Sequence, residues 1–247
     1  MKRTFTDELI QTLYPDDIKC IVCNREIHPN RYGLCDECKL EINDNYCLRC
    51  GRHKVGVGDY CGECSDAVTY FDEARSAVNY DGHAKEIVRR FKYGDAQYLA
   101  KTIGEYLLDV LLFSDWEIDC ITFVPIHKMR KRKRGYNQAE LLADAVAART
   151  DAPCVALLEK TKNTVNQARL DKASRMENLK GTFSAVGAVP PHVLLIDDVM
   201  TTGSTINECC KVLKHAGAKI VYVLTFASVA EKPLLDKVSV NIADFRK

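Results

Sequence analysis

Eight of the twelve cysteines in this chain form four Cys-x2-Cys pairs within its first 64 residues. Each pair places two sulfur atoms on one tight turn, where both can bind the same metal ion. Because two such pairs complete a tetrahedral site with four thiolate ligands, four pairs predict two structural Zn²⁺ sites. The predicted ligands are Cys20, Cys23, Cys35, Cys38, Cys47, Cys50, Cys61 and Cys64.

Disulfides, a redox-active cysteine pair and an iron–sulfur cluster are the other known uses of this spacing. Acidic residues such as Asp7 and Asp16 interrupt any apolar core of signal-peptide length near the N-terminus. We therefore expect a cytoplasmic protein, whose reducing surroundings disfavour disulfides. The spacing leaves the ligand pairing open between consecutive pairs and an interleaved cross-brace, and we favour consecutive pairs.

A second candidate site lies in residues 193–205, where an apolar run leads into two carboxylates and then into hydroxyl side chains. Hydroxyls and amides at the start of a helix bind phosphate, and the helix dipole favours the anion. Two carboxylates would repel a phosphate but can accept hydrogen bonds from sugar hydroxyls. The alternative is an ordinary N-capped helix after a buried strand. The pattern favours a ribose 5-phosphate site made by Asp197, Asp198, Thr201, Thr202, Gly203, Ser204 and Thr205.

A strongly basic run covers residues 128–134, in which every residue except Met129 is Lys or Arg. This local charge predicts an anion site, for a diphosphate or for the backbone of single-stranded DNA, with Tyr136 as a possible stacking surface for a base. The alternative is the solvated start of a helix. The predicted anion contacts are Lys128, Arg130, Arg132, Arg134 and Lys162.

Apolar periodicity after residue 68 predicts alternating strands and helices that position these side chains. Strands are expected at 73–81 (an edge strand), 119–126, 154–158, 193–196 and 218–227, and helices at 84–93, 96–113, 137–149 and 205–215. This alternation predicts an α/β fold with a parallel sheet covered by helices on both faces. Such sheets bind ligands at the carboxyl ends of their strands, which is where the Asp and Thr residues fall.

The overall composition narrows the choice of protein class. The chain has 247 residues, of which 47% are hydrophobic and 28% charged, so global disorder is excluded. The formal net charge of +1 excludes a polycationic protein, and no apolar stretch reaches the roughly 18 residues of a membrane helix, so no membrane insertion is expected. The cysteine clustering predicts two domains, a double zinc ribbon at 1–68 and an α/β domain at 69–247.

The run from Val193 to Thr205 resembles the signature of type I phosphoribosyltransferases. The resemblance implies that fold and a site for phosphoribosyl pyrophosphate (PRPP) with Mg²⁺. It implies that Asp197 and Asp198 contact the ribose hydroxyls, that residues 201–205 hold the 5′-phosphate, and that residues 124–130 bind the diphosphate. A mobile loop would fall between residues 160 and 182. Purine salvage enzymes have an acidic residue at the position of Thr201, which cannot act as a base at neutral pH.

Together with the cysteine ribbon and the PRPP loop, two further blocks resemble the ComF family of phosphoribosyltransferase-like proteins. They are Phe91-Lys92-Tyr93-Gly94 and Arg132-Lys133-Arg134-Gly135-Tyr136-Asn137-Gln138-Ala139. A fifth block, Thr161 to Leu179, fits the mobile loop of that family. The resemblance implies a role in DNA uptake during natural transformation, with PRPP, single-stranded DNA and a DNA-uptake helicase or other competence proteins as partners. Two alternatives stay open, an active phosphoribosyltransferase acting on a base or amine and a PRPP-sensing regulator. No catalytic residue is assigned.

Overall fold

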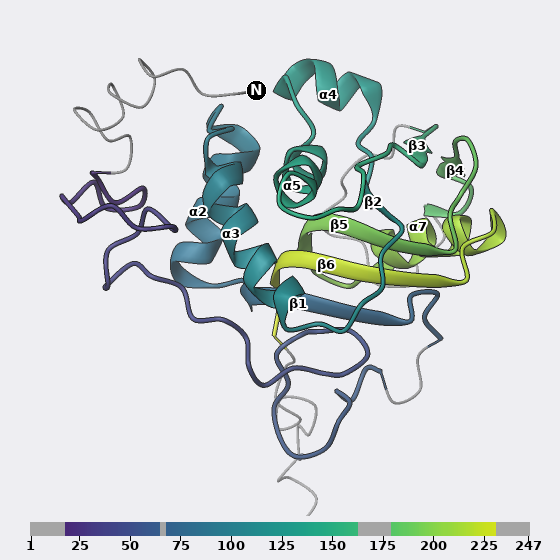
Figure 1. Cartoon of the computed structure of the whole chain (residues 1–247), viewed down its shortest axis with the longest axis horizontal. Helices are drawn as coiled ribbons and strands as arrows, with labels where there is room; N and C mark the ends of the chain where they lie inside the picture. Colours follow the sequence, from purple (N-terminus) through teal and green to yellow (C-terminus); the bar gives the residue numbers. More distant parts are fainter. Residues whose placement is uncertain (1–17, 65–67, 163–178, 231–247) are drawn as a thin grey trace, which may run out of the picture.

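The computed structural model describes residues 18–64, 68–162 and 179–230. Within them lies a four-stranded parallel sheet in the order β1-β6-β5-β2 (Figure 1). Its strands are β1 (Glu73–Asn79), β6 (Ile220–Ser228), β5 (His192–Met200) and β2 (Cys120–Phe123). The predicted parallel sheet, with the strand at residue 73 on its edge, is confirmed.

Helices cover both faces of this sheet, as predicted (Figure 1). On one face lie α2 (Gly82–Tyr93), α3 (Leu99–Leu112) and α5 (Gln138–Ala147), and on the other lies α7 (Ser204–His215). The core between α3 and the sheet includes Tyr106, whose ring meets that of Phe226 on β6 edge-on at 6.1 Å. The helices of the described residues are all too short or too polar to cross a bilayer.

Three short elements lie at the carboxyl ends of the strands. Helix α4 (Lys128–Arg134) follows β2, and β3 (Leu158–Lys160) pairs antiparallel with β4 (Phe183–Ala185) beside α7. The strand expected at 154–158 was placed too early. Cys154 makes a single bridge to Ile121 on the outer edge of β2, and a strand begins only at Leu158.

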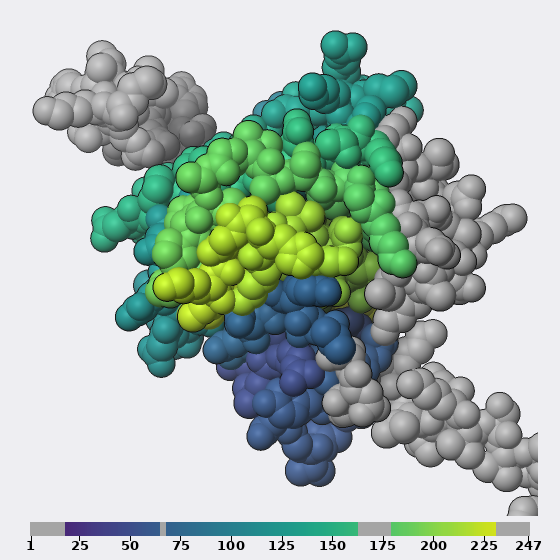
Figure 2. Space-filling view, turned by 90° about the vertical axis from the view of Figure 1, so that its right-hand side faces the viewer, coloured from purple at the N-terminus to yellow at the C-terminus, as the bar shows by residue number. Residues whose placement is uncertain are grey.

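The ribbon module forms no helix or extended strand in its described residues, 18–64, and wraps around two sides of the α/β domain. Its first half, coloured purple in Figure 1, lies beside α2 and α3, and its second half, coloured blue, runs along β1. In Figure 2 the purple and blue atoms lie directly beneath the green and yellow atoms of the sheet domain. The predicted boundary at residue 68 adjoins residues 65–67, which lie outside the described ranges.

The second half of the module covers the exposed edge of β1 with backbone hydrogen bonds. The amide of Asn43 donates to the carbonyl of Ala77 at 2.8 Å, and the amide of Ala74 donates to the carbonyl of Arg49 at 2.9 Å. Gly51 has a positive φ of 67°, and a β-carbon there would lie 2.4 Å from the Cα of Arg75. The edge strand, which would otherwise present unpaired backbone groups, is therefore protected by the ribbon.

Candidate functional site

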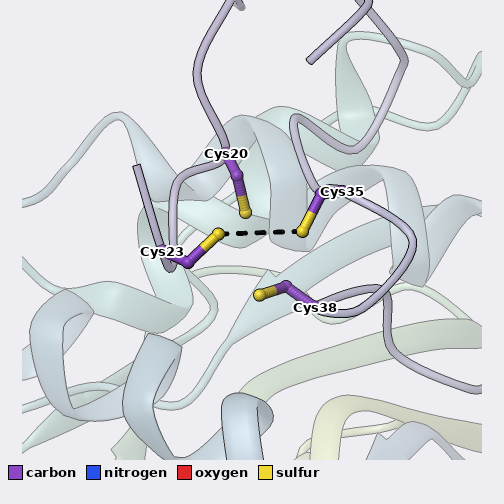
Figure 3. A group of neighbouring side chains, drawn as sticks. All are labelled: Cys20, Cys23, Cys35 and Cys38. Carbon is purple, nitrogen blue, oxygen red and sulfur yellow. Dashed lines mark hydrogen bonds between the residues drawn. The ribbon is translucent and has the colours of Figure 1, made fainter. Parts of the chain in front are cut away.

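The eight predicted ligands form two separate clusters of four sulfur atoms. Cys20, Cys23, Cys35 and Cys38 make the first cluster, and Cys47, Cys50, Cys61 and Cys64 make the second; within each, all Sγ atoms lie within 4.8 Å of one another. Figure 3 shows the four sulfurs of the first cluster pointing toward a common centre. The consecutive pairing expected from sequence is thus confirmed.

The sulfur spacing fits tetrahedral zinc. The Sγ atoms of Cys23 and Cys35 are 3.7 Å apart, as are those of Cys50 and Cys61. A tetrahedron with Zn–S bonds of about 2.3 Å has edges of about 3.8 Å. In the first cluster, burial raises the pKa of the Cys20 thiol, but amide hydrogen bonds from Cys23, Cys35 and Val22 outweigh it and lower the pKa to about 6. The amides of the turn therefore favour the thiolate at Cys20, whereas burial and the neighbouring sulfurs raise the pKa of Cys38.

Asp197 and Asp198 occupy successive positions of β5, so their side chains point to opposite faces of the sheet. Asp198 is buried toward α2, where its Oδ2 lies 2.9 Å from the Nζ of Lys92. Burial, then the charge of Asp198, raises the pKa of Asp197 to about 7, and Lys92 and Lys160 oppose that rise. The pair supplies one carboxylate beside α7 and one ion-paired carboxylate beside α2.

The hydroxyl-rich residues make a compact turn between β5 and α7. Gly203 has a φ of 74° and begins the helix, and its carbonyl accepts from the amide of Asn207 at 2.8 Å. The hydroxyls of Thr202 and Ser204 are 3.0 Å apart. A hollow of about 50 Å³ is lined by six of the seven residues predicted for ribose 5-phosphate, namely Asp197, Thr201, Thr202, Gly203, Ser204 and Thr205. The seventh, Asp198, is paired with Lys92 instead.

The basic run is helix α4, and its side chains divide between two surfaces. Arg130, Arg132, Lys133 and Arg134 line a cavity of about 700 Å³ together with Lys92, Tyr93, Asp95, Gly135 and Tyr136; we call this the basic groove. Lys128 lies on the other side of the helix, in a separate hollow that it shares with Lys131, Arg132 and Gly135. Lys162 is exposed and does not line the basic groove. Three of the five predicted anion contacts therefore come together.

The predicted stacking role of Tyr136 is wrong. Its side chain is buried, with 5% exposure, and its hydroxyl donates to the carbonyl of Phe91 at 2.6 Å. The exposed aromatic of the groove is Tyr93, with 76% exposure, and the guanidinium of Arg134 lies 5.3 Å from its ring. Tyr93 was visible in sequence only as part of the Phe91–Gly94 block.

The residues after α4 anchor the groove. Gly135 ends α4 with a φ of 87°, and the side-chain amide of Gln138 donates to the carbonyl of Phe91 at 3.2 Å. Asn137 caps α5, and its side-chain amide donates to the carbonyl of Val124 at 3.1 Å. These bonds hold α4 and the end of α2 next to the carboxyl end of β2, so this block positions the basic groove.

Two lysines that the sequence reasoning left out of the site contribute to it. Lys92 pairs with Asp198, as described above. Lys160, on β3, lies with its Nζ over the ring of Phe183 at 5.3 Å. Burial, then the charge of Arg130, lowers the pKa of Lys160. Most of the loop expected between 160 and 182, including Asn163, Thr164, Gln167 and Arg175, lies outside the described residues.

Comparisons with known proteins agree with this architecture. A family model described as "Double zinc ribbon domain" matches residues 9–65, and one described as "Phosphoribosyl transferase domain" matches residues 137–244. The chain is 29% identical over 218 residues to "Competence protein F" of Haemophilus influenzae, covering 84% of this chain and 95% of that protein.

Two further relatives show the same pattern. The "DNA utilization protein YhgH" of Salmonella typhimurium is 26% identical over 216 residues, covering 83% of this chain and 94% of its own length. The "Competence protein ComFC" of Streptococcus pneumoniae is 27% identical over 198 residues, covering 76% of this chain and 84% of its own length. The similarity thus extends across both the ribbon and the α/β domain.

Proposed function

Because this chain belongs to the ComF family, with a double zinc ribbon ahead of a phosphoribosyltransferase domain, we propose that it binds PRPP and single-stranded DNA in support of DNA uptake. PRPP would bind at the carboxyl edge of the sheet, and DNA in the basic groove beside it. The Zn²⁺ ions of the ribbon serve structure. The cytoplasm, where incoming single strands and PRPP meet, is the proposed location.

One observation carries the PRPP proposal: the carboxylate of Asp197 and the hydroxyl turn of residues 201–205 enclose the same hollow at the start of α7. A helix start with exposed amides and hydroxyls suits a 5′-phosphate. A carboxylate at the rim suits the ribose hydroxyls, since it accepts hydrogen bonds. The two kinds of group therefore match the two ends of a ribose 5-phosphate.

The flanking cations support a place for the diphosphate. Lys160 and Arg130 are close enough to interact electrostatically, and Lys160 also interacts with Asp197. A diphosphate between them would neutralise this repulsion. Mg²⁺ would then be held chiefly by phosphate oxygens, because it keeps most of its ligands as phosphate or water in such sites. The ion supplies charge neutralisation when it is bound with PRPP.

Calorimetric titration with PRPP and Mg²⁺ tests this site. Asp197→Asn should weaken PRPP binding at least about tenfold, because it removes a charged acceptor for the ribose hydroxyls. Asp119→Asn is the matched control. Asp119 directly precedes β2, at the amino ends of the strands, so this substitution should leave the affinity unchanged. Unchanged affinity in Asp197→Asn would remove the site assignment.

The DNA proposal rests on the basic groove. Its four α4 cations and Lys92 supply charge for phosphates, and Tyr93 supplies an exposed ring for a base. Stacking of a base on an aromatic ring contributes about 1–3 kcal/mol in such grooves. Asp95 is the acidic member of the lining, so the groove keeps a positive balance. Charge and ring together favour a single strand over a duplex.

Fluorescence anisotropy with an oligo-dT probe tests this groove. Tyr93→Ala should weaken binding about fivefold or more. Tyr60→Ala is a close control, because Tyr60 is also exposed and has the guanidinium of Arg49 5.3 Å from its ring, but it lies on the ribbon. Equal losses in the two variants, or none in either, would refute the groove as the DNA site.

Charge reversal separates DNA from diphosphate binding. Arg132→Glu should reduce DNA affinity and flatten the dependence of log K on log salt by about 0.7 or more, since fewer phosphates are neutralised. PRPP affinity should change much less, because Arg132 is exposed on the groove rim.

Release of pyrophosphate that depends on an added base would identify an active phosphoribosyltransferase. PRPP binding without such release would favour a binding or regulatory role.

A further inference from the structure

Arg52 is a buried cation that links the second zinc cluster to the hydroxyl turn of residues 201–205. It follows Cys50 by two positions, and its backbone is fixed in the metal-binding turn. The carbonyl of Arg52 accepts from the amide of Cys47 at 2.9 Å, and its own amide donates to the sulfur of Cys50. The base of the side chain is therefore held by the zinc ligands.

The guanidinium leaves the ribbon and reaches the α/β domain. Its Nη2 donates to the carbonyl of Thr202 at 3.5 Å, and its Nη1 lies 3.5 Å from Oε2 of Glu63. Only 8% of the residue is exposed, and within the described residues its Nε has no hydrogen-bond partner. A buried arginine that is only partly compensated is costly, so its contact with the turn calls for a functional explanation.

Arg52 contacts the Thr202–Gly203 peptide, which borders the proposed phosphate site. Arg52 lines a cavity of about 450 Å³ between ribbon and α7, together with Thr202, Gly203 and Ser204. The same three residues line the small hollow proposed for phosphate, which Arg52 does not line. The turn thus lines both cavities, the one that contains the guanidinium and the one proposed for phosphate.

The geometry of the peptide bond links the contact at the Thr202 carbonyl to the orientation of the Gly203 amide. In a planar trans peptide the carbonyl of one residue and the amide of the next point in opposite directions. A guanidinium that holds the Thr202 carbonyl toward the ribbon therefore turns the Gly203 amide away from the ribbon, toward the hollow. Gly203, with its positive φ, would otherwise tolerate several orientations of this peptide.

We propose that Arg52 is a positioning residue that orients the Thr202–Gly203 peptide for phosphate, so that the second zinc cluster helps to set the PRPP affinity of the turn. This inference rests on the proposed PRPP site. It gives the ribbon a role in ligand binding that neither the cysteine spacing nor the phosphate signature predicts. Because Arg52 contacts the backbone carbonyl of Thr202, this effect on PRPP affinity requires the side chain at position 52 and does not involve the side chain of Thr202.

The test measures PRPP affinity in variants reconstituted with zinc to two ions per chain. Arg52→Met keeps the aliphatic packing and removes the donors, and it should weaken PRPP binding about tenfold. Arg52→Lys should recover part of that loss, because an ammonium can still donate to the Thr202 carbonyl. Arg49→Met is the matched control, since Arg49 lies in the same turn but its guanidinium donates to the carbonyl of Cys64 at 2.7 Å.

The outcomes separate the inference from the function on which it rests. Weaker binding in Arg52→Met alone, with partial recovery in Arg52→Lys and two zinc ions in each, supports the positioning role. Wild-type affinity in Arg52→Met, or an equal loss in Arg49→Met, overturns it. If wild-type protein itself fails to bind PRPP, the proposed function fails, and the inference fails with it. If wild-type protein binds PRPP but no more tightly than Arg52→Met does, only the inference fails.

Discussion

The two zinc clusters have the same ligand chemistry but different surroundings. All four cysteines of the second cluster are buried, with 4% exposure at most, whereas in the first cluster Cys23 is exposed and Cys35 is half-buried. The second ribbon is joined to the domain by backbone hydrogen bonds along β1 and by Arg52 at the hydroxyl turn. Repeated sequence spacing therefore does not imply the same attachment to the α/β domain.

The first ribbon is attached mainly through side chains on α2 and α3. The ring of Tyr32 stacks on that of Tyr106 with centroids 4.4 Å apart, and the hydroxyl of Thr102 donates to the carbonyl of Tyr32 at 2.8 Å. Arg31 pairs with Glu105 and Asp109 at 2.9 and 2.8 Å. Contacts of this kind can be lost one by one, while a ribbon paired with an edge strand is coupled to the whole sheet.

Cys47→Ser should cause the largest loss of stability among the variants that compare the two ribbons. Loss of a ligand from the buried cluster removes zinc that is bound beside β1, and the cost should be about 4 kcal/mol or more. For a chain of this size, that cost corresponds to a decrease in Tm of about 10 °C. Thermal unfolding together with zinc content measures it. Cys154→Ser, outside both clusters, should keep two zinc ions; a small effect of Cys47→Ser would mean that the buried cluster is not structural.

Gly51→Ala should have the next largest effect, because no side chain fits between the ribbon and β1. The new β-carbon would meet backbone atoms of Arg75 at 2.4 Å, and the positive φ adds strain, so about 3 kcal/mol is expected. Gly33→Ala in the first ribbon is the matched variant: its φ of 63° is similar, but its β-carbon would meet Ile21 at an ordinary 3.4 Å. It should cost about 1 kcal/mol.

Denaturant unfolding of the two glycine variants compares the ribbons directly. Since the backbone angle is nearly the same, the difference between their free energies of unfolding isolates the close approach to β1. Equal destabilisation would show that the second ribbon does not dock on the edge strand as tightly as described.

Cys23→Ser should have a smaller effect than Cys47→Ser. Cys23 is the exposed ligand of the first cluster, and this ribbon is attached through side chains, so its loss should unfold the ribbon locally at about 2 kcal/mol. Zinc content should fall to about one ion per chain, and limited proteolysis should cut near residue 23 first. PRPP affinity should remain within about twofold of wild type. A loss of PRPP binding as large as that of Arg52→Met would erase the distinction between the clusters.

What could be predicted from sequence follows from how local each interaction is. The zinc ligands come from turns whose two sulfurs are three residues apart, so spacing alone revealed them and favoured the correct pairing. The hydroxyl turn proposed to bind phosphate is also local, because Thr201 to Thr205 are contiguous and lead into a helix. The parallel sheet followed from apolar periodicity for the same reason.

Several features that the sequence did not predict depend on residues distant in sequence. Tyr136 is buried because its hydroxyl bonds to Phe91, 45 residues away, and Arg52 reaches Thr202 across 150 residues. The expected strand ended at Ile196, whereas β5 continues to Met200, and that extension turns Asp197 and Asp198 to opposite faces. Periodicity and motif spacing carry no information about such contacts, which arise only when the elements pack.

The smallest effect is expected where the first ribbon meets α3, at Tyr32. Its hydroxyl donates to Oδ2 of Asp109 at 2.5 Å, so Tyr32→Phe should cost about 1 kcal/mol at neutral pH while zinc content and PRPP affinity stay unchanged.

The same contact makes the effect depend on pH. Burial and, after it, the hydrogen bond to Asp109 and the charge of Asp109 raise the pKa of Tyr32 to about 12 in the folded protein. A raised phenol pKa means that the unfolded chain loses its proton first, so the stability of the wild type falls as pH rises from about 10 to 12. The phenyl ring of the variant cannot titrate, so the gap in unfolding free energy between wild type and variant should be constant below about pH 10 and should narrow above it. A gap that stays constant above pH 10 would show that Tyr32 is not held by Asp109, and the side-chain attachment of the first ribbon would have to be assigned to Arg31 and to the stacking of Tyr32 on Tyr106.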